Sequence, residues 1–161
     1  MAGFNPRPWT RWMLRQPVRL YDWHAGWVLG RRFLLLTHVG RRSGRRYRTA
    51  LEVIGTHPGT GEILVMSGFG RTADWFRNVL ATPPAELEIG RERFVPVARE
   101  LPEDEAVAAF AAYEQRNRWM APIMNRVLTR MLGWPYDGSD EARRKTVHEL
   151  PIVGFRPADT P

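Results

Sequence analysis

The chain has 161 residues, of which 43% are hydrophobic and 25% charged, and it contains no cysteine. This composition is typical of one soluble globular domain, and it excludes disulfides, iron–sulfur clusters, thiolate metal sites and a cysteine nucleophile. No apolar run has the length of a membrane span, and no signal-peptide pattern opens the chain. We expect a single cytoplasmic domain over residues 1–161, with association at the cytoplasmic membrane face as an alternative.

The net charge of +7 is concentrated in the first third of the chain. Residues 1–50 hold eleven arginines and one acid, Asp22. A GC-rich genome would explain why arginine replaces lysine, but it would not explain the missing acids. Such a one-sided charge favours an anionic partner, which at this point is a phosphate, a carboxylate, a nucleic acid or an acidic membrane.

Residues 1–30 are rich in tryptophan and arginine. Trp9 and Trp12 fit one helical face, Trp23 and Trp27 fit another, and Pro17 separates them, which predicts two short helices. Arginines repeat every four residues beside the aromatic side chains. This segment either caps the domain core, the interpretation that we favour, or lies on an anionic membrane.

The rest of the chain predicts hairpins followed by helices. Apolar runs and turn residues indicate about six strands, at 33–39, 47–54, 62–67, 86–89, 93–99 and 150–155. Residues 47–67 read as one hairpin, and 86–99 as another. Helical patterns cover 72–81, 102–117, 119–132 and 139–149, with Ser139 as a candidate N-cap. This order predicts an α+β protein with a mostly antiparallel sheet or small barrel.

The densest polar feature is the stretch GRRSGRRYRT, residues 40–49, which joins the first two strands. Glycines allow a tight turn, while guanidinium and hydroxyl groups are the donors that phosphate and carboxylate oxygens need. The spacing does not match a Walker A loop. The alternatives are a solvated basic hairpin and a nucleic-acid contact.

A second feature is Ser67-Gly68 at the end of a strand, followed by DWFRN, residues 74–78. Trp75 and Asn78 are three residues apart on one helical face, where they could hold a flat ligand. Packing of Trp75 and Phe76 in the core, with Asn78 at the surface, is the plainer interpretation of this feature alone.

Taken together, the strings LLLTHVGRRSGRRYRTALEVI, DWFRN and PPAELEIG resemble the deazaflavin-dependent nitroreductase family. The resemblance covers about residues 30–100, and the closing LPIVGFRP fits the end of the family pattern. It implies a split β-barrel (FMN-binding-like) fold and an oxidoreductase that uses coenzyme F420, an 8-hydroxy-5-deazaflavin. It also implies coenzyme-binding residues at the matching positions, which are Arg41, Arg42, Ser43, Tyr47, Arg48, Thr49, Ala50, Leu51, Val65, Met66, Ser67, Gly68, Trp75, Phe76 and Asn78.

No catalytic side chain is assigned from the sequence. Some family members place a tyrosine near the coenzyme ring, but here the corresponding region holds Trp119 and Met120. Tyr113 and Tyr136 are the substitutes that we consider. The four histidines lack metal-ligand spacing, so no metal site is proposed, and a partly buried structural role is favoured for His38.

The resemblance implies hydride transfer from the reduced coenzyme to an electron-poor acceptor, such as an activated alkene, a quinone or a nitroaromatic compound. One alternative is a barrel of the same fold that binds FMN or carries a coenzyme or lipid without turnover. An alternative of another class is a basic nucleic-acid-binding module. Expected partners are the small-molecule acceptor, a second copy in a homodimer, and a membrane surface contacted by residues 1–30.

Overall fold

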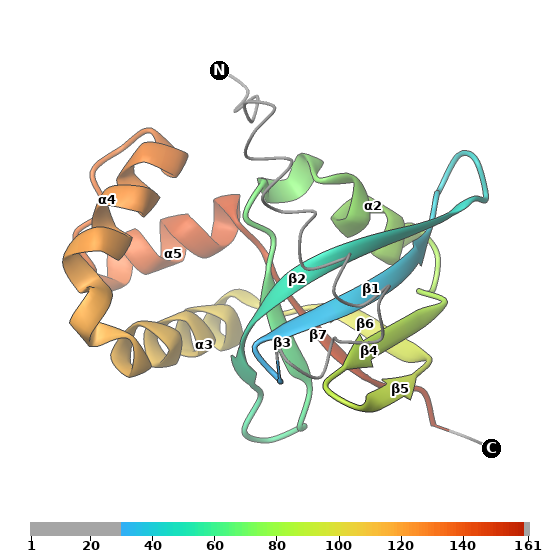
Figure 1. Cartoon of the computed structure of the whole chain (residues 1–161). Helices are drawn as coiled ribbons and strands as arrows, with labels where there is room; N and C mark the ends of the chain where they lie inside the picture. The colour runs from blue at the N-terminus through green and yellow to red at the C-terminus, as the bar shows by residue number, and fades with distance from the viewer. Residues whose placement is uncertain (1–29, 160–161) are drawn as a thin grey trace.

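The computed structural model describes residues 30–159, so the helices expected over residues 1–30 and their membrane contact lie outside the described residues. Seven strands form one antiparallel sheet in the order β5-β4-β1-β2-β3-β7-β6, and the sheet curls into a barrel (Figure 1). The strands are β1 (Phe33–Val39), β2 (Arg46–Thr56), β3 (Ile63–Met66), β4 (Glu86–Ile89), β5 (Glu92–Phe94), β6 (Pro96–Glu100) and β7 (Ile152–Pro157). This arrangement confirms the predicted α+β class with a split β-barrel.

The barrel is split where β5 and β6 meet. A single strand had been expected over residues 93–99, but the structure ends β5 at Phe94 and starts β6 at Pro96, which pairs with β7. Because Pro96 has no N–H, it cannot continue the hydrogen bonds between β4 and β5, and the chain leaves this strand pair at Pro96. The backbone N–H of Ala158 donates to the carbonyl of Val95 at this corner (2.9 Å). The second predicted hairpin is therefore shorter than expected, and the sheet has seven strands instead of about six.

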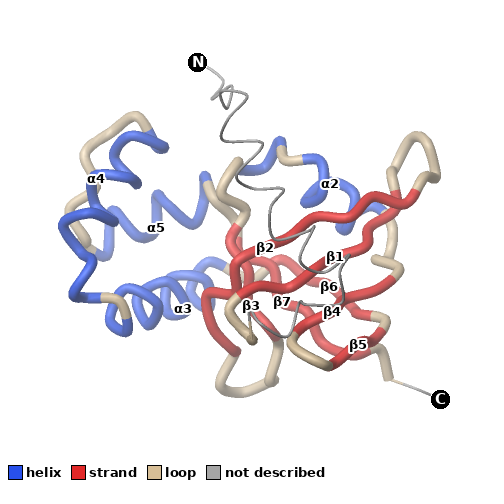
Figure 2. The backbone as a smooth tube through the Cα atoms, viewed as in Figure 1, coloured by secondary structure: helices blue, strands red, loops and turns tan. Residues whose placement is uncertain are grey.

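The helices occupy two places around the barrel. Figure 2 shows α2 over one end of the barrel and the other three gathered at its side. Ser139 is the N-cap of α5, because its Oγ accepts from the backbone N–H of Ala142 (3.1 Å), as predicted. The bounds are α2 (Asp74–Ala81), α3 (Glu103–Arg116), α4 (Ala121–Leu132) and α5 (Asp140–Glu149), with 3-10 turns η2 (Gly70–Thr72) and η3 (Arg118–Met120).

Strand β3 separates two hydrophobic cores. Its side chains alternate, so Val65 points into the barrel while Leu64 faces the helices, and both are buried. The barrel core contains Leu34, Leu36, Leu51, Ile63, Leu87, Ile89, Val153 and Phe155, closed at one end by Trp75, Phe76 and Val79 of α2. The helical core contains Ile54, Leu101, Ala106, Phe110, Leu128, Tyr136, Ala142, Val147, Leu150 and Ile152.

A buried carboxylate links the sheet to α3. Glu62 accepts two hydrogen bonds from the guanidinium of Arg99 (2.7 and 2.6 Å) and one from the hydroxyl of Thr60 (2.7 Å). Arg99 also donates to Glu105 at the start of α3 (2.8 Å). The hydrogen bonds from Arg99 are the main reason that the pKa of Glu62 is lowered, although burial opposes the shift. The carboxylate of Glu62 is therefore charged and fully satisfied.

We predict that Arg99→Met destabilises the protein by about 2–3 kcal/mol, because it leaves the buried Glu62 carboxylate without its cation. The loss is smaller than for a fully buried pair because the Arg99 side chain is 36% exposed. The lowered pKa of Glu62 contributes stability above about pH 4.3, the unfolded value, and this contribution disappears as the pH falls through the folded value. Urea unfolding of wild type and variant at neutral and acid pH measures both effects.

The matched control is Arg93→Met, since Arg93 forms exposed ion pairs with Glu86 and Glu88. We expect a loss below about 1 kcal/mol there. Adding Glu62→Gln to Arg99→Met should recover part of the lost stability. Equal losses for the two arginine variants would contradict a special role for the Glu62 network.

Candidate functional site

The turn between β1 and β2 presents arginines to solvent on a well-defined backbone. The N–H of Gly40 donates to the carbonyl of Arg45 (2.8 Å), and Gly44 has a φ of +68° that favours glycine. A Cβ on Gly40 would lie 2.5 Å from Ser43 Oγ and 2.8 Å from the Tyr47 ring, so a larger residue there would displace both side chains. The turn is therefore compact, and its exposed side chains project from a fixed frame.

Arg41 does not point to solvent with its neighbours but ties the turn to α2. Its Nη1 donates to Asn78 Oδ1 (2.8 Å) and to Asp74 Oδ1 (3.2 Å), and its backbone N–H also donates to Asn78 Oδ1 (3.1 Å). The side-chain oxygen of Asn78 thus accepts two hydrogen bonds from one residue. Because both donors sit on Arg41, the orientation of the turn relative to α2 is determined by this contact.

Asn78 is also hydrogen-bonded to His38, which in turn is hydrogen-bonded to Thr49. Because Arg41 offers only donors, the Asn78 oxygen faces it, and the amide NH2 faces His38 Nδ1 (3.0 Å). Nδ1 is then an acceptor, so the imidazole proton lies on Nε2 and is donated to Thr49 Oγ1 (3.0 Å). Thr49 accepts this bond, which leaves its own hydroxyl hydrogen free to be donated to a ligand.

Burial keeps His38 neutral. Desolvation lowers the pKa of the buried imidazole, and the charge of Asp74 only partly opposes it. The ring also stacks on Tyr47, with centroids 5.8 Å apart and planes at 27°. The Tyr47 hydroxyl lies 3.2 Å from Ser43 Oγ. The turn, the inward face of β2 and α2 therefore form one connected polar cluster.

At the end of β3, the Ser67 side chain is hydrogen-bonded to the backbone. Its hydroxyl donates to the carbonyl of Gly70 (2.7 Å), its own N–H donates to the carbonyl of Pro151 (2.8 Å), and the residue is fully buried. Gly68 is half-buried, and a Cβ there would lie 3.8 Å from Met131 Cε of α4. Ser67 thus holds the turn in place, and Gly68 borders α4.

The residues expected to bind coenzyme fall into two groups. One group has buried side chains that can support a ligand site only through the backbone or through other residues: Leu51, Val65, Ser67, Trp75, Phe76 and Asn78. The other group has exposed or half-buried side chains: Arg41, Arg42, Ser43, Tyr47, Arg48, Thr49, Ala50, Met66 and Gly68. The surface placement considered for Asn78 is wrong, since Asn78 is buried.

Alternation along β2 divides the expected run of five contiguous residues. Tyr47, Thr49 and Leu51 share the face that continues into the barrel core, where they pair with His38, Leu36 and Leu34 across β1. Arg48 and Ala50 lie on the opposite face, and Arg48 approaches Glu88 (3.8 Å). A ligand on one face of the sheet meets only alternate side chains of this strand.

The two candidate tyrosines lie in different surroundings. Tyr136 is buried in the helical core between Phe110 and Trp134, and its hydroxyl donates to Glu114. Burial, more than the hydrogen bond to Glu114, raises the pKa of Tyr136. Tyr113 is half-buried, and burial and the nearby Glu52 carboxylate raise its pKa. Tyr113 lines a cavity between β2 and α3.

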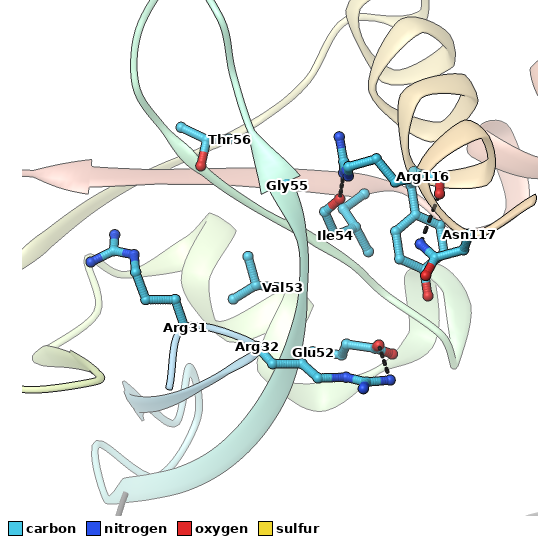
Figure 3. A pocket seen from close by; sticks show the side chains of 10 residues that line it. Arg31, Arg32, Glu52, Val53, Ile54, Gly55, Thr56, Arg116 and Asn117 are labelled. Carbon is cyan, nitrogen blue, oxygen red and sulfur yellow. Dashed lines mark hydrogen bonds and ion pairs between the residues drawn. The ribbon is translucent and has the colours of Figure 1, made fainter. Parts of the chain in front are cut away.

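That cavity, of about 400 Å³, lies at the far end of β2 from the arginine turn (Figure 3). Arg116 crosses it and donates to the carbonyl of Ile54, and the lack of a side chain at Gly55 leaves room for the guanidinium. The lining holds three guanidinium groups and one carboxylate, but Arg31 pairs with Glu92 (2.7 Å) and Arg32 with Glu52 (3.7 Å), so much of this charge is compensated. The residues are Arg31, Arg32, Glu52, Val53, Ile54, Gly55, Thr56, Tyr113, Arg116 and Asn117.

Sequence reasoning missed His38 and Asp74 as members of the polar cluster, and Arg116 as a member of the cavity. A signal existed for His38, because it follows Leu34 and Leu36 at a period of two and so faces inward. No such signal exists for Arg116, which meets β2 only through the packing of α3 against the sheet.

We predict that His38→Leu costs about 1–3 kcal/mol of stability, since the buried Asn78 amide loses its acceptor. The lowered pKa of His38 also means that wild-type stability falls as the pH drops below about 6.5, where the unfolded imidazole takes up a proton that the folded one resists. Urea unfolding across this pH range should show the slope in wild type and a reduced slope in the variant.

His148→Gln is the control, because the His148 side chain is exposed at the end of α5. It should leave the stability at neutral pH unchanged, since the side chain makes no buried contact. A His38→Leu variant with the full wild-type slope would refute a neutral, buried His38.

The F420H(2)-dependent quinone reductase family matches residues 13–125 of the chain. Among solved structures, an F420-H2 dependent reductase (FDR-A) is 21% identical with a TM-score of 0.43, over 79% of this chain and 96% of that one. A structure described as a domain-swapped dimer is 21% identical with a TM-score of 0.46, over 91% and 98%. A protein of unknown function from Agrobacterium tumefaciens is 14% identical with a TM-score of 0.51, over 99% and 60%. No curated protein matches the chain.

The likeness to the Agrobacterium protein concerns the fold alone, given its low identity. The family match carries more, because it covers more than half of the chain and spans the arginine turn, the end of β3 and α2. It confirms the resemblance to deazaflavin-dependent reductases seen in the motifs. The chain belongs to the F420H(2)-dependent quinone reductase family and is an F420-dependent reductase.

Proposed function

We propose that this reductase binds the anionic end of coenzyme F420 at the arginine turn, residues 40–46, and reduces a quinone. The observation that supports the proposal is the charge of this turn, and the sequence resemblance described above implies coenzyme binding at the same residues. No acid occurs between Phe33 and Leu51. The coenzyme carries a phosphodiester and an acidic tail, and guanidinium groups are suited to both.

The exposed arginines of the turn have the donors that such a ligand needs. Arg42, Arg45 and Arg46 are exposed, and none of them forms an ion pair with another residue of the described range 30–159. Arg41 differs, since its guanidinium is already engaged by Asp74 and Asn78. We therefore assign phosphate and carboxylate binding to the three exposed arginines, and positioning of the turn to Arg41.

The ring of the coenzyme would lie beyond this anchor, along the accessible part of the cluster. Thr49 can donate its hydroxyl hydrogen to a ring or ribityl oxygen, and Tyr47 offers an exposed ring face beside it. Gly68 and Met66 leave a half-buried surface at the end of β3. A bound reduced deazaflavin supplies a hydride, and the task of these residues is to hold it, orient it and exclude water.

The family name favours a quinone as the acceptor over the activated alkenes and nitroaromatic compounds that the motifs alone allowed. Neither candidate tyrosine lies at the proposed ring position, because Tyr136 is buried in the helical core and Tyr113 lines the cavity at the far end of β2. The proposed source of the proton is therefore solvent. A homodimer remains a further proposal.

We predict that Arg42→Ala weakens F420 binding by about 1.5–3 kcal/mol, roughly 10- to 150-fold, the loss expected for a charge-assisted hydrogen bond. Titration of the purified protein with F420, followed by coenzyme fluorescence, measures this loss. Arg156→Ala, which removes a half-buried arginine at the end of β7, far from the turn in sequence, is the matched control and should bind F420 as wild type does.

Unchanged affinity in Arg42→Ala would remove Arg42 from the site. Parallel titration with FMN tests the alternative coenzyme, and tighter binding of FMN than of F420 would overturn the assignment. Turnover of reduced F420 with a quinone, a nitroaromatic compound and an activated alkene then compares the acceptors. We expect the quinone to have the highest kcat/KM, and a slower rate with it than with either rival would contradict the quinone proposal.

A further inference from the structure

The outward side of α4 and the turn before it exposes large apolar side chains. Trp119 is 77% exposed, Ile123 60% and Val127 51%. Successive members are four residues apart, so they lie on one side of the helix. Apolar side chains exposed to this degree, and in a row, are unusual for a surface that faces only water.

The opposite side of the same helix is firmly packed. Leu128 is buried in the helical core, and Met124 and Met131 are half-buried against it. Figure 1 shows α4 on the outside of the helical layer, away from the barrel. The helix therefore has two apolar sides: one packs in the helical core, and the other is a row of side chains turned outward.

Arginines surround the outward row. Residues 115–136 contain four arginines and no acid. Arg116 donates to the Ile54 carbonyl, and the other three, Arg118, Arg126 and Arg130, are exposed and form no ion pair with any residue between 30 and 159. Arg126 and Arg130 are also four residues apart, and they neighbour Ile123 and Val127 on the helix. The surface therefore combines apolar and cationic side chains with no carboxylate.

We propose that this surface, formed by Trp119, Ile123, Val127, Arg118, Arg126 and Arg130, docks on an anionic lipid bilayer. The apolar row would enter the headgroup region, where tryptophan is favoured, and the guanidinium groups would contact lipid phosphates. No helix within residues 30–159 is long and apolar enough to cross a membrane. The contact is accordingly peripheral, parallel to the bilayer plane.

The charge of the surface argues against two other occupants. A second copy docked on it through a two-fold axis would face arginine with arginine and offer no acid to pair with them. A nucleic acid would satisfy the guanidinium groups and could stack a base on Trp119, but it would leave Ile123 and Val127 without an apolar partner. A bilayer suits both kinds of side chain at once.

Docking through α4 would also bring the end of β3, the part of the candidate coenzyme site that borders this helix, toward the lipid. Met131, on the inner side of this helix, lies beside Gly68 at the end of β3. The docking proposal does not depend on which acceptor the enzyme reduces. If the acceptor is a lipid-soluble quinone, the same contact would bring the enzyme to its substrate.

The test is vesicle flotation of the full-length protein with phosphatidylcholine alone and with phosphatidylcholine containing phosphatidylglycerol. We expect binding to the anionic vesicles only, and its loss at high salt. Two variants probe the surface: Trp119→Ser/Ile123→Ser/Val127→Ser, and Arg126→Gln/Arg130→Gln. Each should reduce the partition coefficient at least ten-fold, since each arginine near an anionic surface contributes about five-fold. Leu80→Ser/Val95→Ser, which removes exposed apolar groups elsewhere, is the matched control and should bind as wild type does.

Full vesicle binding by both surface variants would assign any membrane contact to another part of the chain and overturn the proposal. So would an absence of wild-type binding to anionic vesicles. Two further measurements separate the rival occupants. Binding to duplex DNA or RNA without vesicle binding would assign the surface to nucleic acid, and a dimer lost in the serine variant without vesicle binding would assign it to a second copy. Coenzyme titration in the absence of lipid should be unchanged in both variants.

Discussion

The contact between Arg41 and Asn78 determines how the candidate site is assembled. One amide oxygen on α2 accepts both the backbone and a side-chain donor of Arg41, so the arginine turn cannot shift without breaking two hydrogen bonds. The same amide then sets the tautomer of His38 and, through it, the role of Thr49 as a donor. A buried asparagine therefore controls the direction in which a side chain two contacts away can donate. Every buried side-chain nitrogen and oxygen within residues 30–159 has a hydrogen-bond partner, which favours a single conformation of this network.

Arginine serves different purposes in this protein because its surroundings differ. Arg99 neutralises a buried carboxylate, Arg41 holds a turn, and Arg116 bonds a strand carbonyl. The exposed arginines of the turn and those of α4 have no acidic partner in the described part of the chain. The net charge of +7 does not separate these groups. Only an arginine whose charge remains uncompensated attracts an anion strongly, so position and pairing decide function where the total charge does not.

Local sequence patterns predicted the helices and strands well, but they did not predict how the sheet closes into a barrel. The structure confirms the predictions that depend on neighbours in sequence: the apolar run of β1, the N-cap of α5 and the β2–β3 hairpin. The split between β5 and β6 depends on where the sheet edges meet, which is a property of the whole barrel. Pro96 marks the place, but a proline alone does not tell whether a strand ends or changes partner. The surface placement of Asn78 was wrong for a related reason, because the burial of Asn78 depends on a hairpin turn 37 residues earlier in the chain.

The position of the candidate site follows from the register of the β1–β2 hairpin. Passing outward along its inward face, the cross-strand pairs change from Leu34 with Leu51, to Leu36 with Thr49, to His38 with Tyr47. Apolar packing thus gives way to hydrogen bonding and then to an exposed aromatic ring, over about four residues of strand. The arginine turn stands directly beyond this gradient. Strand β3 could not host such a change, because both of its faces are buried in hydrophobic cores. A polar site connected to the barrel interior is therefore possible only where the β1–β2 hairpin leaves the core and α2 supplies a polar partner.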